Sequence, residues 1–143
     1  MGTANDVPRL LQPVLDCPYP RALAEFYRRL LGFVYRAGDE PREDDPGAQD
    51  EDWLVLLRPS GERGLAFQQA DDHEETTWPR PGVPQQMHLD LTVTSRAELD
   101  AQHERALELG ARLVLDRSED EHEPLRVYAD PAGHRFCIFV APG

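Results

Sequence analysis

The order of apolar and polar residues along the chain predicts two successive units with the same series of elements. In the first half, an apolar stretch precedes a segment with helical spacing of apolar residues, and three short strand-like stretches follow. The second half repeats this order after a proline-rich break, PRPGVP, at 79–84. The expected helices are 20–31 and 96–109, and the expected strands are 10–17, 33–36, 53–58, 64–70, 87–94, 111–116, 125–129 and 135–140.

Residues at the ends of the two expected helices support their bounds. Phe26 and Tyr27 belong to the apolar stripe of the first helix, and Gly32 follows that helix as a C-terminal cap. Ser95 is a favourable N-cap for the second helix, and Glu98 at the third helical position completes a capping box. The capping residues therefore define the end of the first helix and the start of the second.

The two halves also correspond position by position. Gln12 corresponds to His88 and Leu23 to Leu99, each pair 76 residues apart, and both helices end in Leu-Gly. This internal repeat predicts an α+β fold made of tandem βαβββ modules. We expect one domain over 1–143, with modules at 10–78 and 85–142 and a linker at 79–84.

Charge and composition narrow the classes of function. The chain has 27 acidic and 15 basic residues, a net charge of −12, and no lysine among its bases. This balance disfavours nucleic-acid binding, and the lack of lysine excludes Schiff-base chemistry. No apolar run approaches the roughly 20 residues of a membrane span, and no secretory signal is recognisable. With only Cys17 and Cys137, we expect a reduced, cytoplasmic protein without a membrane partner.

Alternation in the strand expected at 87–94 separates a polar face from an apolar one. His88, Asp90 and Thr92 share the polar face, which should line a cleft, while the apolar face packs against a helix. Asp90 beside His88 is a candidate catalytic acid–base residue. The alternative is that Asp90 pairs with a cleft arginine, either Arg126 or Arg135.

The same argument gives a second set of candidates in the first half. Gln12, Val14 and Asp16 share one face of the first expected strand, and Asp16 is a second candidate catalytic acid–base residue. Phe67 and Trp78 are aromatic candidates for the wall of a ligand pocket. The predicted ligand-binding cleft therefore contains Gln12, Val14, Phe67, Trp78, Thr92 and Arg126.

Three short motifs together resemble a known superfamily. They are Phe26-Tyr27 with the LLGF that follows at 30–33, HLDL at 88–91, and DPAG at 130–133 with Phe136. This combination resembles the vicinal oxygen chelate superfamily, which includes glyoxalase I, bleomycin-resistance proteins, fosfomycin-resistance enzymes and extradiol dioxygenases. The resemblance extends from about residue 10 to residue 141. It implies curled sheets around a cleft, a small-molecule ligand and a homodimer.

The resemblance also implies a site for one divalent metal ion, Zn²⁺, Ni²⁺, Mn²⁺ or Fe²⁺. Its ligands would come from the first and fourth strands of the modules, at Gln12, Gln68 or Gln69, His88 and Cys137. His88 is the best ligand of this set, because glutamine amides are weak donors for these metals. We expect Cys137 to keep its proton and to pack as a small buried apolar residue in place of a ligand.

Three functions remain open from the sequence. The first is a metal-dependent, glyoxalase-like enzyme in which the metal acts as a Lewis acid on two neighbouring oxygens of the substrate. The second is a metal-free binding protein that sequesters a small molecule in the cleft. The third is catalysis by His88 and Asp90 without a metal.

Overall fold

The computed structural model describes residues 6–141 and contains the βαβββ series twice. Both helices have the predicted bounds. No helix within residues 6–141 is long and apolar enough to cross a bilayer. The first module consists of β1 (Val14–Cys17), α1 (Pro20–Leu31), β2 (Val34–Tyr35), β3 (Trp53–Leu57) and β4 (Arg63–Gln69). The second consists of β5 (Leu89–Val93), α2 (Arg96–Leu109), β6 (Arg112–Arg117), β7 (Leu125–Ala129) and β8 (Arg135–Val140).

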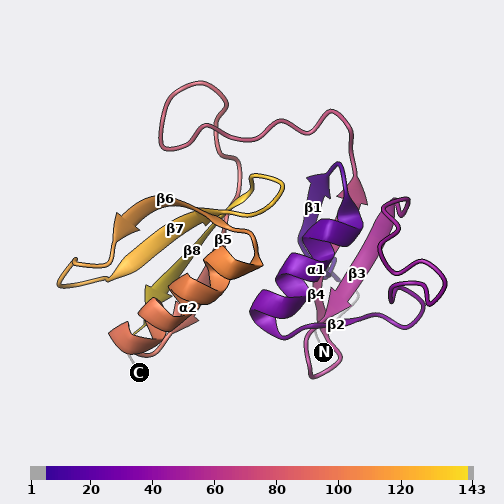
Figure 1. Ribbon diagram of the computed structural model, residues 1–143, viewed down its shortest axis with the longest axis horizontal. Coiled ribbons are helices and arrows are strands. Elements are labelled where there is room, and N and C mark those ends of the chain that lie inside the picture. The colour runs from indigo at the N-terminus through magenta and orange to yellow at the C-terminus, as the bar shows by residue number, and fades with distance from the viewer. Residues whose placement is uncertain (1–5, 142–143) are drawn as a thin grey trace.

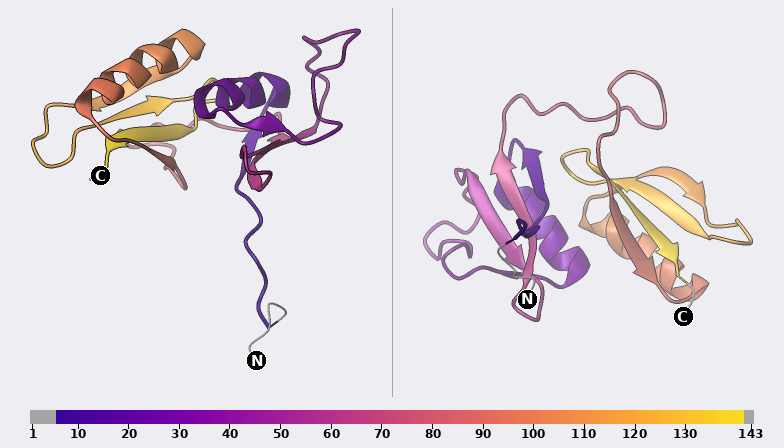
Figure 2. Two further views of the ribbon diagram at one scale, coloured as in Figure 1. Left: turned by 90° about the horizontal axis from the view of Figure 1, so that it is seen from below. Right: turned by 180° about the vertical axis from the view of Figure 1, so that it is seen from behind.

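Each module forms its own four-stranded mixed sheet. The strand orders are β1-β4-β3-β2 and β5-β8-β7-β6, with β1–β4 and β5–β8 the parallel pairs. The two sheets stand side by side, and the segment 70–88, which contains the linker, crosses from one to the other (Figure 1). Both helices cover the same side of the molecule (Figure 2), which leaves the opposite face of each sheet free to line a site.

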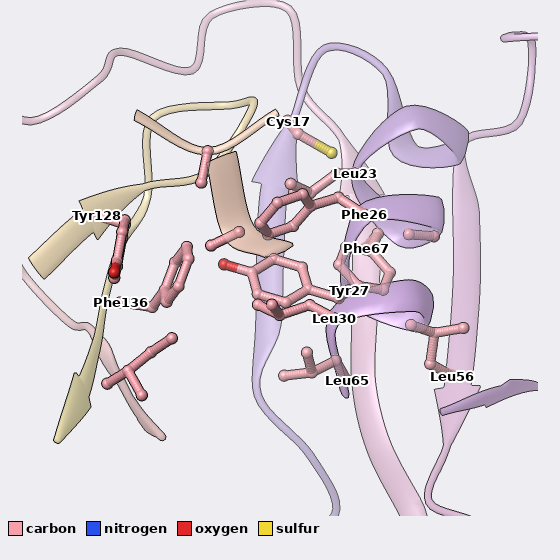
Figure 3. Close-up of a cluster of buried hydrophobic side chains, with 14 of the residues drawn as sticks. Cys17, Leu23, Phe26, Tyr27, Leu30, Leu56, Leu65, Phe67, Tyr128 and Phe136 are labelled. Atoms are coloured by element: carbon pink, nitrogen blue, oxygen red, sulfur yellow. The ribbon is translucent and has the colours of Figure 1, made fainter. Parts of the chain in front are cut away.

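The largest aromatic side chains of α1 hold the two modules together. Phe26 and Tyr27 are buried, and their ring centroids lie 5.8 Å and 6.1 Å from that of Phe136 in β8. Figure 3 shows these side chains facing Phe136 and Tyr128 across the gap between the modules. The apolar stripe predicted for this helix is therefore the centre of a core that both modules share.

A buried hydrogen bond adds to this contact. The hydroxyl of Tyr27 donates to Asp130 Oδ2 at 2.6 Å, and Asp130 Oδ1 accepts the backbone N–H groups of Ala132 and His134. Burial raises the pKa of Asp130 above its ordinary value. The DPAG motif thus combines a tight turn with a polar attachment point for α1.

Two strands begin more than one residue later than the sequence predicted. Apolar residues at 10–11 suggested a strand from residue 10, but β1 begins at Val14, and Leu10 is 94% exposed. Pro13 immediately before β1 has no N–H to donate to a ladder, although its carbonyl accepts from Ala66. In the same way β5 begins at Leu89 instead of residue 87, so His88 lies just before the strand.

Candidate functional site

Three chemically reactive side chains meet on the open face of the second module. Asp90 in β5 and Cys137 in β8 are register partners, so their side chains point the same way. The Cys137 thiol donates to Asp90 Oδ1 at 2.8 Å, and His88 Nε2 lies 3.0 Å from the same oxygen. One potential ligand atom from each residue lies within 4.8 Å of the others. One carboxylate oxygen is therefore shared by an imidazole and a thiol.

This arrangement keeps Cys137 protonated. Burial, followed by the hydrogen bond to Asp90 and its charge, raises the pKa of the thiol to about 12. The side chains of His88 and Asp90 are 47% and 57% exposed, so solutes can reach the group. We refer to His88, Asp90 and Cys137 as the triad.

Cys137 keeps its proton as predicted, but its surroundings differ from the prediction. It is half-buried and bonded to a carboxylate, whereas the sequence indicated a small apolar side chain. The strand alternation placed Asp90 correctly on the open face, but nothing in the sequence gave the register between β5 and β8. The pairing of Asp90 with Cys137 follows from that register.

A pocket of about 430 Å³ lies between β1, the end of the linker and the start of β5. Val14 and Asp16 line it from the first module, and His88, Gln85 and His134 line it from the second half of the chain. Its volume falls in the range of small-molecule sites. His134 also fixes one wall, because its Nε2 lies 2.7 Å from the backbone carbonyl of Asp16.

Gln85 was not singled out from the sequence, yet it joins this pocket to the triad. Its Nε2 lies 3.4 Å from His88 Nδ1. Its Oε1 is buried and has no hydrogen-bond partner within the described part of the chain. A glutamine next to a proline-rich linker carries no periodic signal, so only the structure identifies it.

The glutamines that the resemblance indicated as metal ligands lie apart from the triad. Gln12 Oε1 accepts a hydrogen bond from Arg63 Nη1 at 3.1 Å. Gln68 is exposed and pairs in register with Asp16, and Gln69 donates to a nearby carboxylate. None of the three glutamines lines the pocket beside His88.

The repeat explains part of this difference. With the 76-residue offset, Val14 is equivalent to Asp90, and their register partners are Ala66 and Cys137. Ala66, two residues before Gln68, is therefore the fourth-strand counterpart of Cys137. The predicted ligand, Gln68 or Gln69, lies two or three residues beyond this counterpart along β4.

Two predicted pocket residues lie on the wrong side of the sheets. Phe67 is fully buried and stacks on Tyr27, with ring centroids 6.1 Å apart. Arg126 is 9% exposed and forms an ion pair at 3.0 Å with Asp100 of α2. Both side chains contact helices, which corrects the prediction that they line a cleft.

Two other residues predicted to line the cleft, Thr92 and Trp78, lie at the surface or beside a hollow. Thr92 is exposed on the same face as Asp90, two residues from it along β5. Trp78 lines a second, smaller hollow of about 270 Å³, together with Arg80 and Arg112. The roles of these residues in binding stay predictions.

Comparison with known proteins decides the family. The model of the glyoxalase-like domain family matches residues 12–139, which is most of the chain. The chain belongs to this family. No curated protein matches it significantly.

Solved structures agree with this glyoxalase-like assignment. A glyoxalase/bleomycin resistance protein/dioxygenase family enzyme from Burkholderia phytofirmans is 16% identical, with a TM-score of 0.67 over 93% of this chain and 98% of its own. A glyoxalase/dioxygenase from Nostoc punctiforme is 15% identical, with a TM-score of 0.62 over 100% and 97%. At such identities the similarity shows the fold, and it confirms the predicted tandem βαβββ architecture.

A third similar structure contains a metal. It is a mutant of the fosfomycin resistance protein from Listeria monocytogenes, in complex with Mn(II) and 1S,2S-dihydroxypropylphosphonic acid. It is 15% identical, with a TM-score of 0.67 over 94% of this chain and 93% of its own.

Proposed function

We propose that this glyoxalase-like protein binds a small molecule in the pocket between its modules and one divalent metal ion at the triad. The observation that carries the proposal is the convergence of His88, Asp90 and Cys137, whose ligand atoms lie within 4.8 Å of one another. The adjoining pocket of about 430 Å³ includes His88 in its wall. A metal at the triad would therefore face the bound molecule.

The chemistry of the donors fits a metal ion. Imidazole nitrogen, carboxylate oxygen and thiolate sulfur are all zinc ligands, and three protein ligands with one open position are typical of catalytic zinc sites. The sulfur of Cys137 favours Zn²⁺ over harder ions such as Mn²⁺. Asp90 supplies the anionic oxygen that the sequence prediction did not find among the ligand positions.

The other residues of the pocket suggest a division of roles. Asp90 is occupied by His88 and Cys137, whereas the exposed side chain of Asp16 belongs to the part of the pocket that the first module lines. Asp16 is therefore our candidate for taking a proton from the bound molecule. When bound, the metal would polarise an oxygen of that molecule as a Lewis acid. The Mn(II) and dihydroxy ligand of the Listeria protein support this type of chemistry in the same fold.

Metal content of the purified, untagged protein tests the proposal. We expect about one metal ion per chain, and a higher melting temperature on addition of zinc, since a ligand of the native state stabilises it. His88→Ala and Cys137→Ser should lose both effects. His122→Ala, in an exposed loop, is the matched control and should keep both. A wild-type protein that takes up no metal and shows no shift contradicts the proposal.

A metal-free binding protein is the second candidate. It is favoured by the hydrogen bonds within the triad, where Asp90 accepts from Cys137 and the thiol pKa is raised to about 12. The group is thus satisfied without an ion. In that case a small molecule found by screening should bind equally well with and without a chelator. We expect a homodimer under either function, which sedimentation analysis would test.

A further inference from the structure

Gln85 makes a contact that decides which nitrogen of His88 carries a proton. Its amide Nε2 faces His88 Nδ1 at 3.4 Å, and the other ring nitrogen, Nε2, lies 3.0 Å from Asp90 Oδ1. A neutral imidazole has one donor and one acceptor nitrogen. Because an amide nitrogen only donates, this orientation of the Gln85 amide makes Nδ1 the acceptor. The proton then resides on Nε2 and is donated to Asp90.

In this state His88 has no free lone pair for a metal. The imidazole nitrogen that faces Asp90 is protonated, and the nitrogen that is not protonated is occupied by Gln85. A metal ligand needs an unprotonated nitrogen, and a ligating histidine usually donates its other N–H to an acceptor. Metal binding through His88 Nε2 therefore requires the proton to move to Nδ1.

The side chain of Gln85 allows this change. A half-turn of its amide would bring Oε1 to His88 Nδ1, where it would accept the relocated proton. Oε1 is buried without a partner among residues 6–141, so the turn breaks no hydrogen bond made by that oxygen. In the observed orientation the amide nitrogen contacts His88 and the oxygen has no partner among residues 6–141, so the turn exchanges one hydrogen bond to His88 for another. The occupant of the triad can then decide between them.

We propose that Gln85 is a positioning residue that sets the tautomer of His88. In the metal-free protein, its Nε2 donates to Nδ1 and holds the Nε2 proton of His88 against Asp90. With a metal at the triad, its Oε1 accepts from Nδ1–H and leaves Nε2 unprotonated. The second statement rests on the proposed metal-binding function, whereas the first does not.

The test uses two substitutions at this position in the full chain. Gln85→Glu offers only acceptors to His88, and Gln85→Leu offers neither donor nor acceptor. Nitrogen-15 chemical shifts of the His88 ring, measured on metal-free protein at a pH where the ring is neutral, report the tautomer. We expect the proton on Nε2 in the wild type, on Nδ1 in Gln85→Glu, and a weaker preference in Gln85→Leu.

Zinc affinity, measured by competition with a chelator, provides the second readout. Gln85→Glu should bind zinc about 10-fold more tightly, in line with the usual effect of hydrogen-bond partners of metal ligands. Gln86→Glu is the control, because Gln86 lines the same pocket and the substitution adds the same charge. Equal tightening in both variants would assign the effect to charge and overturn the second statement.

The tautomer separates this inference from the proposed function. A wild-type proton on Nδ1, or a tautomer that Gln85→Glu leaves unchanged, overturns the role of Gln85 whatever the zinc result. If the tautomer moves as expected but no variant binds zinc, the metal proposal fails and Gln85 still positions His88. Spectra that are unchanged for residues away from the pocket show that the variants are folded.

Discussion

The two modules have the same topology but different side chains at equivalent positions. Where the second module brings together His88, Asp90 and Cys137, the first module has Gln12, Val14 and Ala66. In the helices, it is the first module that contributes more, because α1 is more deeply buried than α2. Seven residues of α1 are buried, against two of α2, and α1 alone supplies the aromatic contacts to the other module. One module thus provides most of the shared core and the other provides the reactive group.

The largest expected effect concerns the helices. Phe26→Ala should lower the free energy of unfolding by about 3–5 kcal/mol, because it leaves a cavity between the modules. The equivalent residue of α2 is Gln102, which is only half-buried, so Gln102→Ala should cost less than about 0.5 kcal/mol. Urea denaturation measures both. Similar losses in the two helices would show that the core is not concentrated on α1.

The next effect concerns metal binding at equivalent positions. His88→Ala should weaken zinc binding by at least about 100-fold, since even indirect partners of a ligand have effects of this size. Gln12→Ala should leave the affinity unchanged, because Gln12 is bonded to Arg63 and lies outside the pocket. Chelator competition on both variants gives the comparison. Loss of affinity in Gln12→Ala would mean that both modules supply ligands.

The reactivity of the two cysteines provides a third comparison. Burial comes first among the causes that raise the pKa of each thiol to about 12, and Asp90 is the next cause for Cys137 alone. In metal-free protein at about pH 8, Asp90→Asn should therefore increase alkylation of Cys137 about 10-fold, as a pKa lower by one unit would. Cys17 should react no faster in this variant. Mass spectrometry of the two cysteine peptides separates the rates, and equal changes would point to loosening of the whole structure.

The smallest effect concerns the turns before β4 and β8. Burial raises the pKa of Asp130, so the native state holds a proton that the unfolded chain releases. The stability that this proton contributes is present below the ordinary carboxyl pKa and is lost as the pH rises through the raised value. Relative to Asp130→Asn, the wild type should lose stability as the pH rises above the ordinary carboxyl pKa of about 4.

The equivalent turn of the first module gives the control for that pH dependence. It has the exposed Arg58 in place of Asp130. The backbone N–H of Gly61 donates to the carbonyl of Arg58, as that of Gly133 donates to the carbonyl of Asp130. Arg58→Gln should therefore leave the pH dependence of the melting temperature unchanged. A parallel pH profile for wild type and Asp130→Asn would contradict a proton held at Asp130.

The sequence was informative wherever local patterns decide the structure. The bounds of both helices follow from spacing and caps, and the alternation around Asp90 placed its side chain on the open face. By contrast, β4 contains the unbroken apolar run GLAF, which has no alternation to show which side chains face the helix. The sequence therefore did not reveal that Phe67, a candidate for the pocket wall, lies in the core.

The part of the site that the sequence did not predict depends on distant pairing. Asp90 and Cys137 are 47 residues apart and meet only because β5 and β8 pair in one register. A shift by one residue would send the two side chains to opposite faces. Gln85 lies outside every regular element, so its contact with His88 has no local signature.

The most direct test of a metal site in the second module is X-ray absorption spectroscopy of the zinc-loaded protein. The account predicts one sulfur ligand at about 2.3 Å, with nitrogen and oxygen ligands at about 2.0–2.2 Å. In Cys137→Ser the sulfur signal should disappear. A zinc ion bound by nitrogen and oxygen alone in the wild type would contradict the role given to Cys137 and, with it, the proposed triad.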